Sequence, residues 1–204
     1  MSSRKKENKL REKYDHIIGV DVAGISAIAG PMIFVALEMD KDKRINGTKA
    51  ARLTLEQKKI KGLYDIFNRV WKQIKILSVA EVSPKEINAY GQRDAIKIGI
   101  EKVIQHFLDS NNLNPTKCYF LIDFFDTDLD NVNKESIKNG DDTEYVLSCA
   151  SIVANILHKQ YMKRIHSEFP IYNWAVNFGQ KDQIHKDALR IYGASMFHRD
   201  PDIT

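Results

Sequence analysis

Short apolar runs alternate along the chain with longer segments of helical periodicity. Residues 16–20 and 32–37 are apolar runs of the kind that form strands buried on both faces, with a Gly-Pro turn between them. This pattern predicts a hairpin at the start of the folded domain. Two further strands are predicted at residues 76–82 and 118–122.

Apolar residues at helical spacing mark the segments between these strands. The predicted helices cover residues 53–75, 84–108, 145–169 and 186–192. Thr54 and Ser83 stand at predicted N-caps, the second followed by proline. The first half of the longest helix is apolar on nearly all sides, which is typical of a helix deep in a core. The acidic stretch 126–142 lacks periodicity and is predicted to be a loop.

This order of elements predicts an α/β fold, in which helices flank a central mixed β-sheet. A length of 204 residues fits one domain. We expect that domain to cover residues 16–200, with a basic N-terminal arm at 1–15 and a tail at 201–204. The arm is predicted to be solvated, and contact with nucleic acid is the alternative.

Composition changes this picture little. The formal net charge of +4 permits nucleic-acid binding but does not show it, because phosphate binding needs Lys and Arg on one face. Cys118 and Cys149 lie in apolar runs and are expected to be reduced core residues. No apolar run approaches the length of a membrane span. We therefore expect no membrane partner and a cytoplasmic protein, in a host cytoplasm if a phage or virus encodes it.

The first candidate functional residues are Asp21 and Asp123, which stand at the ends of two predicted strands. Either residue alone is weak evidence of a site, because Asp at the end of a strand is often simply a turn residue. After Asp21, however, small residues and glycines follow closely, and they allow another backbone to approach.

The segment around Asp21 resembles the opening motif of type 2 ribonucleases H, the bacterial HII family, whose pattern is G-x-D-E-A-G-R-G-x-x-A-G-P. The matching residues are Gly19, Asp21, Ala23, Gly24, Ala29, Gly30 and Pro31. Val22 stands where the family has Glu, and Ile25-Ser26 stand where it has Arg-Gly.

Later segments resemble the same family in the same order. They are V-S-P-K-E-I-N-A-Y-G-Q-R-D-A at 82–95, L-I-D at 121–123, G-D at 140–141, S-C-A-S-I-V-A-N at 148–155, and in the C-terminal run P-I-Y at 170–172, Y-G at 192–193 and H-R at 198–199. The resemblance spans residues 16 to 200. It implies a single ribonuclease H-like domain.

The resemblance also implies a two-metal endonuclease that cleaves the RNA strand of RNA–DNA hybrids with Mg²⁺ or Mn²⁺. The family supplies four carboxylates, and Asp21 and Asp123 are the expected catalytic metal ligands. By this alignment Val22 replaces a second acid, and Lys159 replaces an acid on the long helix. Mg²⁺ prefers hard oxygen ligands, so both changes weaken the site.

Three interpretations stay open. Lys159 or His158 completes the catalytic site, the lysine as a fixed positive charge near the phosphate and the histidine as a ligand. Alternatively, loop acids replace the missing ligands: Asp126, Asp128, Asp141, Asp142 or Glu144. For Asp141 a structural cap on the long helix is favoured. Lastly, the site is inactive and the fold serves as a nucleic-acid-binding or protein-interaction module.

Residues that contact substrate are also implied by the resemblance. The family's junction-reading loop corresponds to Gly24, Ile25 and Ser26, and Gln180 stands where the family has a stacking Tyr. Lys181 and Arg199 are expected near phosphate, and His185 is expected to make a structural hydrogen bond or a phosphate contact. We favour the nuclease over the inactive module, because Asp21 and Asp123 are retained at two separate strand ends.

Overall fold

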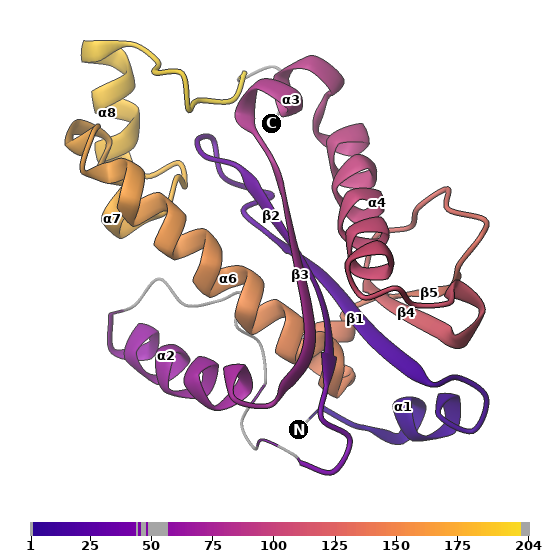
Figure 1. The fold of residues 1–204 in the computed structure, drawn as a ribbon. Helices are drawn as coiled ribbons and strands as arrows, with labels where there is room; N and C mark the ends of the chain where they lie inside the picture. The colour runs from indigo at the N-terminus through magenta and orange to yellow at the C-terminus, as the bar shows by residue number, and fades with distance from the viewer. Residues whose placement is uncertain (1, 44, 46–47, 49–56, 201–204) are drawn as a thin grey trace.

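The computed structural model describes residues 2–43, 45, 48 and 57–200. Its centre is a five-stranded mixed sheet in the order β3-β2-β1-β4-β5 (Figure 1). The strands are β1 (His16–Ala23), β2 (Met32–Met39), β3 (Ile74–Val82), β4 (Cys118–Asp123) and β5 (Asn133–Ile137). Strand β2 pairs antiparallel with both β1 and β3. Strand β4 pairs parallel with both β1 and β5. The predicted mixed sheet and its opening hairpin are confirmed.

Helices cover both faces of this sheet (Figure 1). They are α1 (Lys5–Leu10), α2 (Gln57–Trp71), α3 (Pro84–Tyr90), α4 (Gln92–Ser110), α5 (Gly140–Thr143), α6 (Tyr145–His166), α7 (Trp174–Asn177) and α8 (Gln183–Tyr192). Alternate residues of β1 face opposite sides, so Ile17 joins the core under α6 while Ile18 joins the core under α4. The long helix α6 is buried along most of its length, as its sequence predicts.

Helix α6 passes very close to the strand that carries Asp21. A Cβ on Gly19 would lie 2.7 Å from the carbonyl oxygen of Val146, a distance that no real side chain tolerates. Glycine at this position therefore sets how tightly α6 packs on β1, and it brings the side chains of α6 to the end of the strand.

Several predicted boundaries need correction. The helix predicted over 84–108 is two helices, because Gly91 adopts φ 78° and interrupts the chain between α3 and α4. The predicted loop 126–142 contains β5 and α5. The apolar pattern does not predict β5, because this edge strand is polar and only half-buried. The capping box at Ser83 and Glu86 is present, and Thr54 lies outside the described residues.

The N-terminal segment is not a solvated arm. Ser2, Glu7 and Tyr14 are buried, and the Glu7 carboxylate accepts a hydrogen bond of 2.9 Å from the backbone N–H of Val146. The Arg4 guanidinium lies 4.1 Å from the centre of the Tyr145 ring. The segment before β1 is therefore packed against the start of α6.

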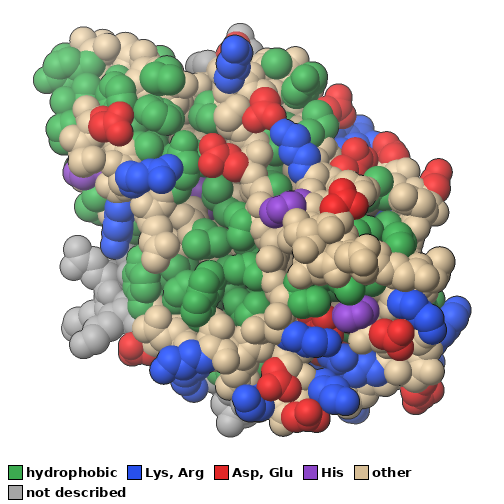
Figure 2. All heavy atoms as spheres, viewed as in Figure 1, with side chains coloured by type: hydrophobic (Ala, Val, Ile, Leu, Met, Phe, Trp, Pro, Cys, Tyr) green, Lys and Arg blue, Asp and Glu red, His purple; other side chains and the backbone are tan. Residues whose placement is uncertain are grey.

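The surface carries no single basic face in the view of Figure 2, where Lys and Arg side chains are interspersed with Asp and Glu. Apolar side chains gather at the end occupied by α7 and α8, where Ile184, Ile191 and Tyr192 are more than half exposed. Among the described helices, none combines the length and the apolar character needed to cross a membrane. On this face, charge does not mark a substrate surface.

Candidate active site

The ends of β1 and β4 bring two carboxylates together. These strands are parallel neighbours with Val20 paired to Ile122, so the next residues, Asp21 and Asp123, leave the same edge of the sheet side by side. Both side chains are about 8% exposed and line one pocket of about 400 Å³. The structure thus brings together the two acids that the sequence predicts as metal ligands.

A third carboxylate, Asp141, lines the same pocket. It follows Gly140 at the start of α5, and one oxygen of Asp123 (Oδ1) accepts hydrogen bonds from the backbone N–H groups of Gly140 at 2.6 Å and Asp141 at 3.3 Å. The chain after β5 is therefore tied to the end of β4. This arrangement places Asp141 beside the two acids at the strand ends.

The prediction that Asp141 caps the long helix is wrong. The N-cap position of α6 is Glu144, whose side chain makes no capping hydrogen bond, and the buried backbone N–H of Val146 donates to Glu7 instead. In the sequence, the Gly140-Asp141 pair matches a G-D pair of the family pattern. An acid just before a helix fits both a cap and a metal site, and only the fold distinguishes the two.

The pocket concentrates negative charge in a confined space. Burial first, then the neighbouring Asp123 and to a smaller extent Asp141, raise the pKa of Asp21 to about 8. Hydrogen bonds from the Ser151 hydroxyl and the Val22 N–H act in the opposite direction. A group of acids in this environment is stabilised by a bound cation.

The chemistry of these donors fits a hard divalent ion, because all three side chains offer carboxylate oxygens. Val22 also lines the pocket, half-buried and packed on the core below α4, and it brings no charge. Within the part of the chain that the structure describes, no three His, Cys, Asp or Glu side chains already stand in metal-binding geometry.

Lys159 and His158 do not reach the carboxylates. Both are about 5% exposed and neither lines the pocket. The Lys159 ammonium lies 4.8 Å from the centre of the Phe178 ring, and burial lowers its pKa. His158 lies beneath Gly24, where a Cβ would meet its Nε2 at 2.6 Å. Burial, followed by the charges of Arg199 and Lys159, lowers the pKa of His158 to about 3.

The other loop acids lie away from the three carboxylates. Of Asp126, Asp128, Asp142 and Glu144, none lines the carboxylate pocket. Asp128 is exposed and accepts a hydrogen bond from the ammonium of Lys97 at 2.8 Å. The candidate acids are therefore Asp21, Asp123 and Asp141.

The predicted substrate-reading residues divide into two groups, and the first lines the pocket. Gly24, Ile25 and Ser26 form its rim together with Gln180, whose amide Nε2 donates to the Ser26 hydroxyl at 3.2 Å. Gly24 has φ 87°, a conformation that favours glycine, and a Cβ there would also lie only 2.7 Å from the carbonyl oxygen of Pro31. Lys181 is exposed and does not line the pocket.

Arg199 and His185 form the second group, and they support the rim from below. Arg199 is 3% exposed and donates to the carbonyl oxygens of Ile25 and Gly30, both at 2.9 Å. His185 is fully buried, and its Nδ1 donates to the carbonyl oxygen of Gln180 at 2.9 Å. The structural hydrogen bond predicted for His185 is therefore present. Arg199, predicted to lie near phosphate, is instead buried and holds two backbone carbonyls of the rim.

Comparison with known proteins finds one family along almost the whole chain. The family described as Ribonuclease HII matches residues 18–201. The Ribonuclease HII of Orientia tsutsugamushi (strain Boryong) is 32% identical over 184 residues, which cover 90% of this chain and 83% of that protein. The Ribonuclease HII of Caldicellulosiruptor bescii is 29% identical over 193 residues, with coverages of 95% and 89%.

Solved structures show the same fold at lower identity. The RNase HII in a complex with PCNA from Archaeoglobus fulgidus superposes with a TM-score of 0.71 at 14% identity, covering 91% of this chain and 94% of that one. The ribonuclease H2 of Pyrococcus horikoshii gives a TM-score of 0.66 at 18% identity, with coverages of 90% and 92%. A Bst-RNase HIII in complex with Mn²⁺ gives 0.64 at 16%, with coverages of 92% and 66%.

Proposed function

Since the chain belongs to the ribonuclease HII family, which consists of ribonuclease H-type endonucleases, we propose that it cleaves the RNA strand of RNA–DNA hybrids. The observation that carries this proposal is the convergence of Asp21, Asp123 and Asp141 in one pocket. The inactive alternative rested on the loss of two of four expected carboxylates. Because Asp141 lines the pocket, it can supply one of the two missing carboxylates.

The donor chemistry supports Mg²⁺ or Mn²⁺ as the cofactor, held by Asp21, Asp123 and Asp141. Mg²⁺ is commonly bound through one or two carboxylates, with water and substrate phosphate oxygens as the remaining ligands. This habit agrees with the absence of a preformed three-residue metal group among the described side chains. When bound, such ions stabilise the negative charge on the attacking and leaving oxygens of a phosphodiester.

The protein's own contribution is to fix these acids before substrate arrives. The N–H groups of Gly140 and Asp141 hold the Asp123 carboxylate, and Ser151 and the Val22 N–H hold Asp21. Fixed donors and acceptors need not reorganise during the reaction, which is the main source of electrostatic catalysis.

The backbone of Gly24 lines the rim of the pocket, where the sugar–phosphate backbone of a substrate would pass. The side chains of Ser26 and Gln180 lie beside it and offer hydrogen-bond donors and acceptors to sugar hydroxyls, the groups that distinguish RNA from DNA. Arg199 and His185 hold this rim in place.

We also propose that the protein acts in the cytoplasm, because its two cysteines, Cys118 and Cys149, are free and buried. One structural neighbour was solved as a complex with PCNA. A protein partner in addition to the nucleic acid is therefore part of this proposal.

A cleavage assay on four labelled substrates tests the activity: RNA–DNA hybrid, double-stranded RNA, single-stranded RNA and duplex DNA with one embedded ribonucleotide. Each is incubated with Mg²⁺, with Mn²⁺ and with a chelator. We expect metal-dependent cutting of the hybrid, lost in Asp21→Asn and kept in Asp109→Asn, an exposed acid in the last turn of α4. Absence of cutting under every condition would overturn the proposal.

A further inference from the structure

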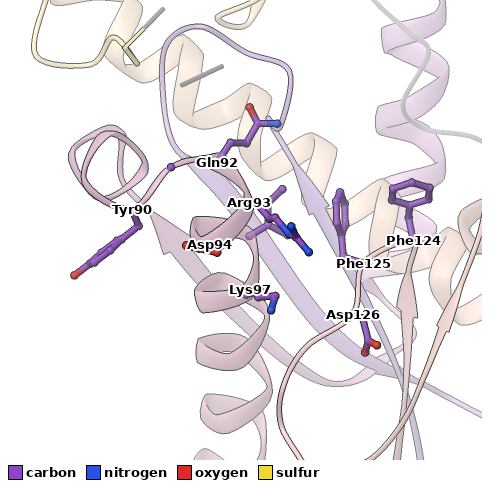
Figure 3. A pocket seen from close by; sticks show the side chains of 10 residues that line it. Tyr90, Gln92, Arg93, Asp94, Lys97, Phe124, Phe125 and Asp126 are labelled. Atoms are coloured by element: carbon purple, nitrogen blue, oxygen red, sulfur yellow. The ribbon is translucent and has the colours of Figure 1, made fainter. Parts of the chain in front are cut away.

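A second, larger pocket of about 820 Å³ adjoins the carboxylate pocket (Figure 3). One wall is the junction of α3 and α4, and the other is the segment that leaves β4 directly after Asp123. Phe124 and Phe125 line both pockets. The two hollows therefore share a wall, and a substrate in the first pocket can extend into the second.

Phe124 has a conformation that its residue type does not favour. Its φ is 64°, in the left-handed region where a bulky side chain strains the backbone. The residue is 57% exposed, and its ring touches Phe125 edge to face, with ring centres 5.2 Å apart. Core packing does not account for a large aromatic ring held in water at the cost of strain. Such strain is concentrated at ligand-binding sites.

The opposite wall of this pocket offers positive charge. Arg93 lies in the first turn of α4, where the chain restarts after Gly91, and Figure 3 shows its side chain reaching across the pocket toward Phe125. Arg93 is exposed and makes no hydrogen bond or ion pair with any residue in the described part of the chain. Its neighbour Lys97 is already paired with Asp128 at 2.8 Å.

Acidic side chains are also present, since Asp94 and Asp126 line the same pocket. The unpaired guanidinium on the first turn of a helix nonetheless suits a phosphate, because the positive end of the helix dipole lies there as well. An exposed aromatic ring together with an unpaired arginine is the combination by which proteins hold a nucleic-acid strand without reading its sequence.

Building on the proposed function, we propose that this pocket is a second substrate subsite. The Phe124 ring packs against a sugar or base face of the hybrid beside the cleaved bond, and Arg93 binds a phosphate of the strand that leaves the carboxylate pocket. The subsite orients the duplex relative to the three acids. Both residues bind substrate and neither takes part in bond cleavage.

Two variants and one control test this subsite. Phe124→Gly removes the ring and suits the backbone conformation, and Arg93→Gln removes the charge. Arg69→Gln is the control, since Arg69 is exposed on α2, which packs against α6 away from α4 (Figure 1). We measure KM and kcat for cleavage of an RNA–DNA hybrid, the Kd for a fluorescently labelled hybrid in chelator, and the thermal midpoint of each variant.

Each subsite variant should raise KM and Kd about tenfold, with a smaller effect on kcat. Arg93→Gln should also reduce the salt dependence of Kd by about one phosphate contact. Phe124→Gly should leave the thermal midpoint unchanged or raised, because glycine relieves the strain. If Phe124 were structural, this variant would lower the midpoint and leave KM unchanged.

The proposed activity and the subsite can fail separately. An active wild-type enzyme whose KM and Kd are the same in both subsite variants overturns the subsite and leaves the activity standing. If the wild type cuts nothing, weaker hybrid binding by both variants supports the subsite and overturns the activity alone. A loss confined to Arg93→Gln overturns the role of Phe124.

Discussion

The carboxylate of Asp123 holds the backbone of Asp141. One oxygen, Oδ1, accepts the N–H of Gly140 at 2.6 Å and that of Asp141 at 3.3 Å. A strand-end acid therefore anchors the turn that delivers the next acid to the same pocket. Gly140 makes this possible, because a Cβ there would lie 3.3 Å from the same oxygen and 2.3 Å from the Leu147 side chain.

Asp141→Asn should abolish cleavage while the fold persists. The amide keeps the shape of the side chain but removes one of the three carboxyl groups from the pocket. Bound metal ions supply several kcal/mol of transition-state stabilisation, so we expect kcat/KM to fall at least about a hundredfold. Asp142→Asn is the matched control, because Asp142 does not line the pocket. Equal activity of the two variants would remove Asp141 from the site.

Val22→Glu should strengthen metal binding. Val22 lines the pocket next to Asp21, so a glutamate there adds a fourth carboxylate. More ligand charge lowers the ion concentration needed for half-maximal activity, by about tenfold for roughly 1.4 kcal/mol of added binding. Titration of activity with Mg²⁺ measures this shift. Val22→Gln has a similar shape without the charge and should leave the midpoint where the wild type has it.

Lys159→Met should retain activity. The Lys159 side chain is buried against Phe178 and away from the acids, so methionine fills its space without leaving a charge in the core. We expect kcat/KM within about threefold of the wild type and an equal or higher free energy of unfolding. Urea unfolding and the hybrid-cleavage assay measure both. A hundredfold loss of kcat in a folded variant would return Lys159 to the catalytic site.

His198 should make the protein less stable in mild acid. Burial, and then the nearby His185, lowers the pKa of His198 to about 4, below the 6.5 of an exposed histidine. Because the folded pKa is lower, the unfolded state binds the proton more readily, and stability is lost as the pH falls from about 6.5 toward 4. The contribution between pH 7 and pH 5 is about 2 kcal/mol.

Urea unfolding at these two pH values measures the effect. His198→Gln should be less sensitive to pH than the wild type, since it removes the titrating ring. His106→Gln, which alters an exposed histidine on α4, should keep the wild-type pH dependence. A His198→Gln variant with an unchanged pH slope would contradict this assignment.

Glu7→Ala should destabilise the protein, although Glu7 does not line the carboxylate pocket. The Glu7 side chain is 1% exposed and accepts the N–H of Val146 at the start of α6. Loss of a helix-capping side chain costs about 1 kcal/mol. Glu12→Ala, an exposed acid just after α1, serves as the control. Identical midpoints for both variants in thermal unfolding would show that the N-terminal segment does not stabilise α6.

The strand ends at Asp21 and Asp123 were predictable because β1 and β4 are continuous apolar runs that are buried on both faces. β5 was not predictable in this way. Its sequence, NKESI, is polar and half-buried at the edge of the sheet, so neither alternation nor apolar content marks it. Gly91 was equally hard to read, since apolar spacing continues from α3 into α4 across the break.

The site was harder to predict than the fold because its members come from distant parts of the chain. The resemblance to the family suggested Lys159, whereas the way α6 packs turns that side chain toward Phe178. Sequence patterns reveal which residues are apolar or charged, but the direction of a side chain on a buried helix depends on every element around it. Phe124 gave no sequence signal, because its importance lies in a backbone angle.

The start of the chain has a consequence for synthesis. The N–H of Ser3 donates to the carbonyl oxygen of Thr143, and the N–H of Tyr145 donates to that of Ser3. A ribosome makes these N-terminal residues first, yet their partners emerge only after some 140 more residues have been added. The nascent chain must therefore hold its opening segment undocked until most of the domain has emerged, and contacts this distant in sequence slow the completion of folding.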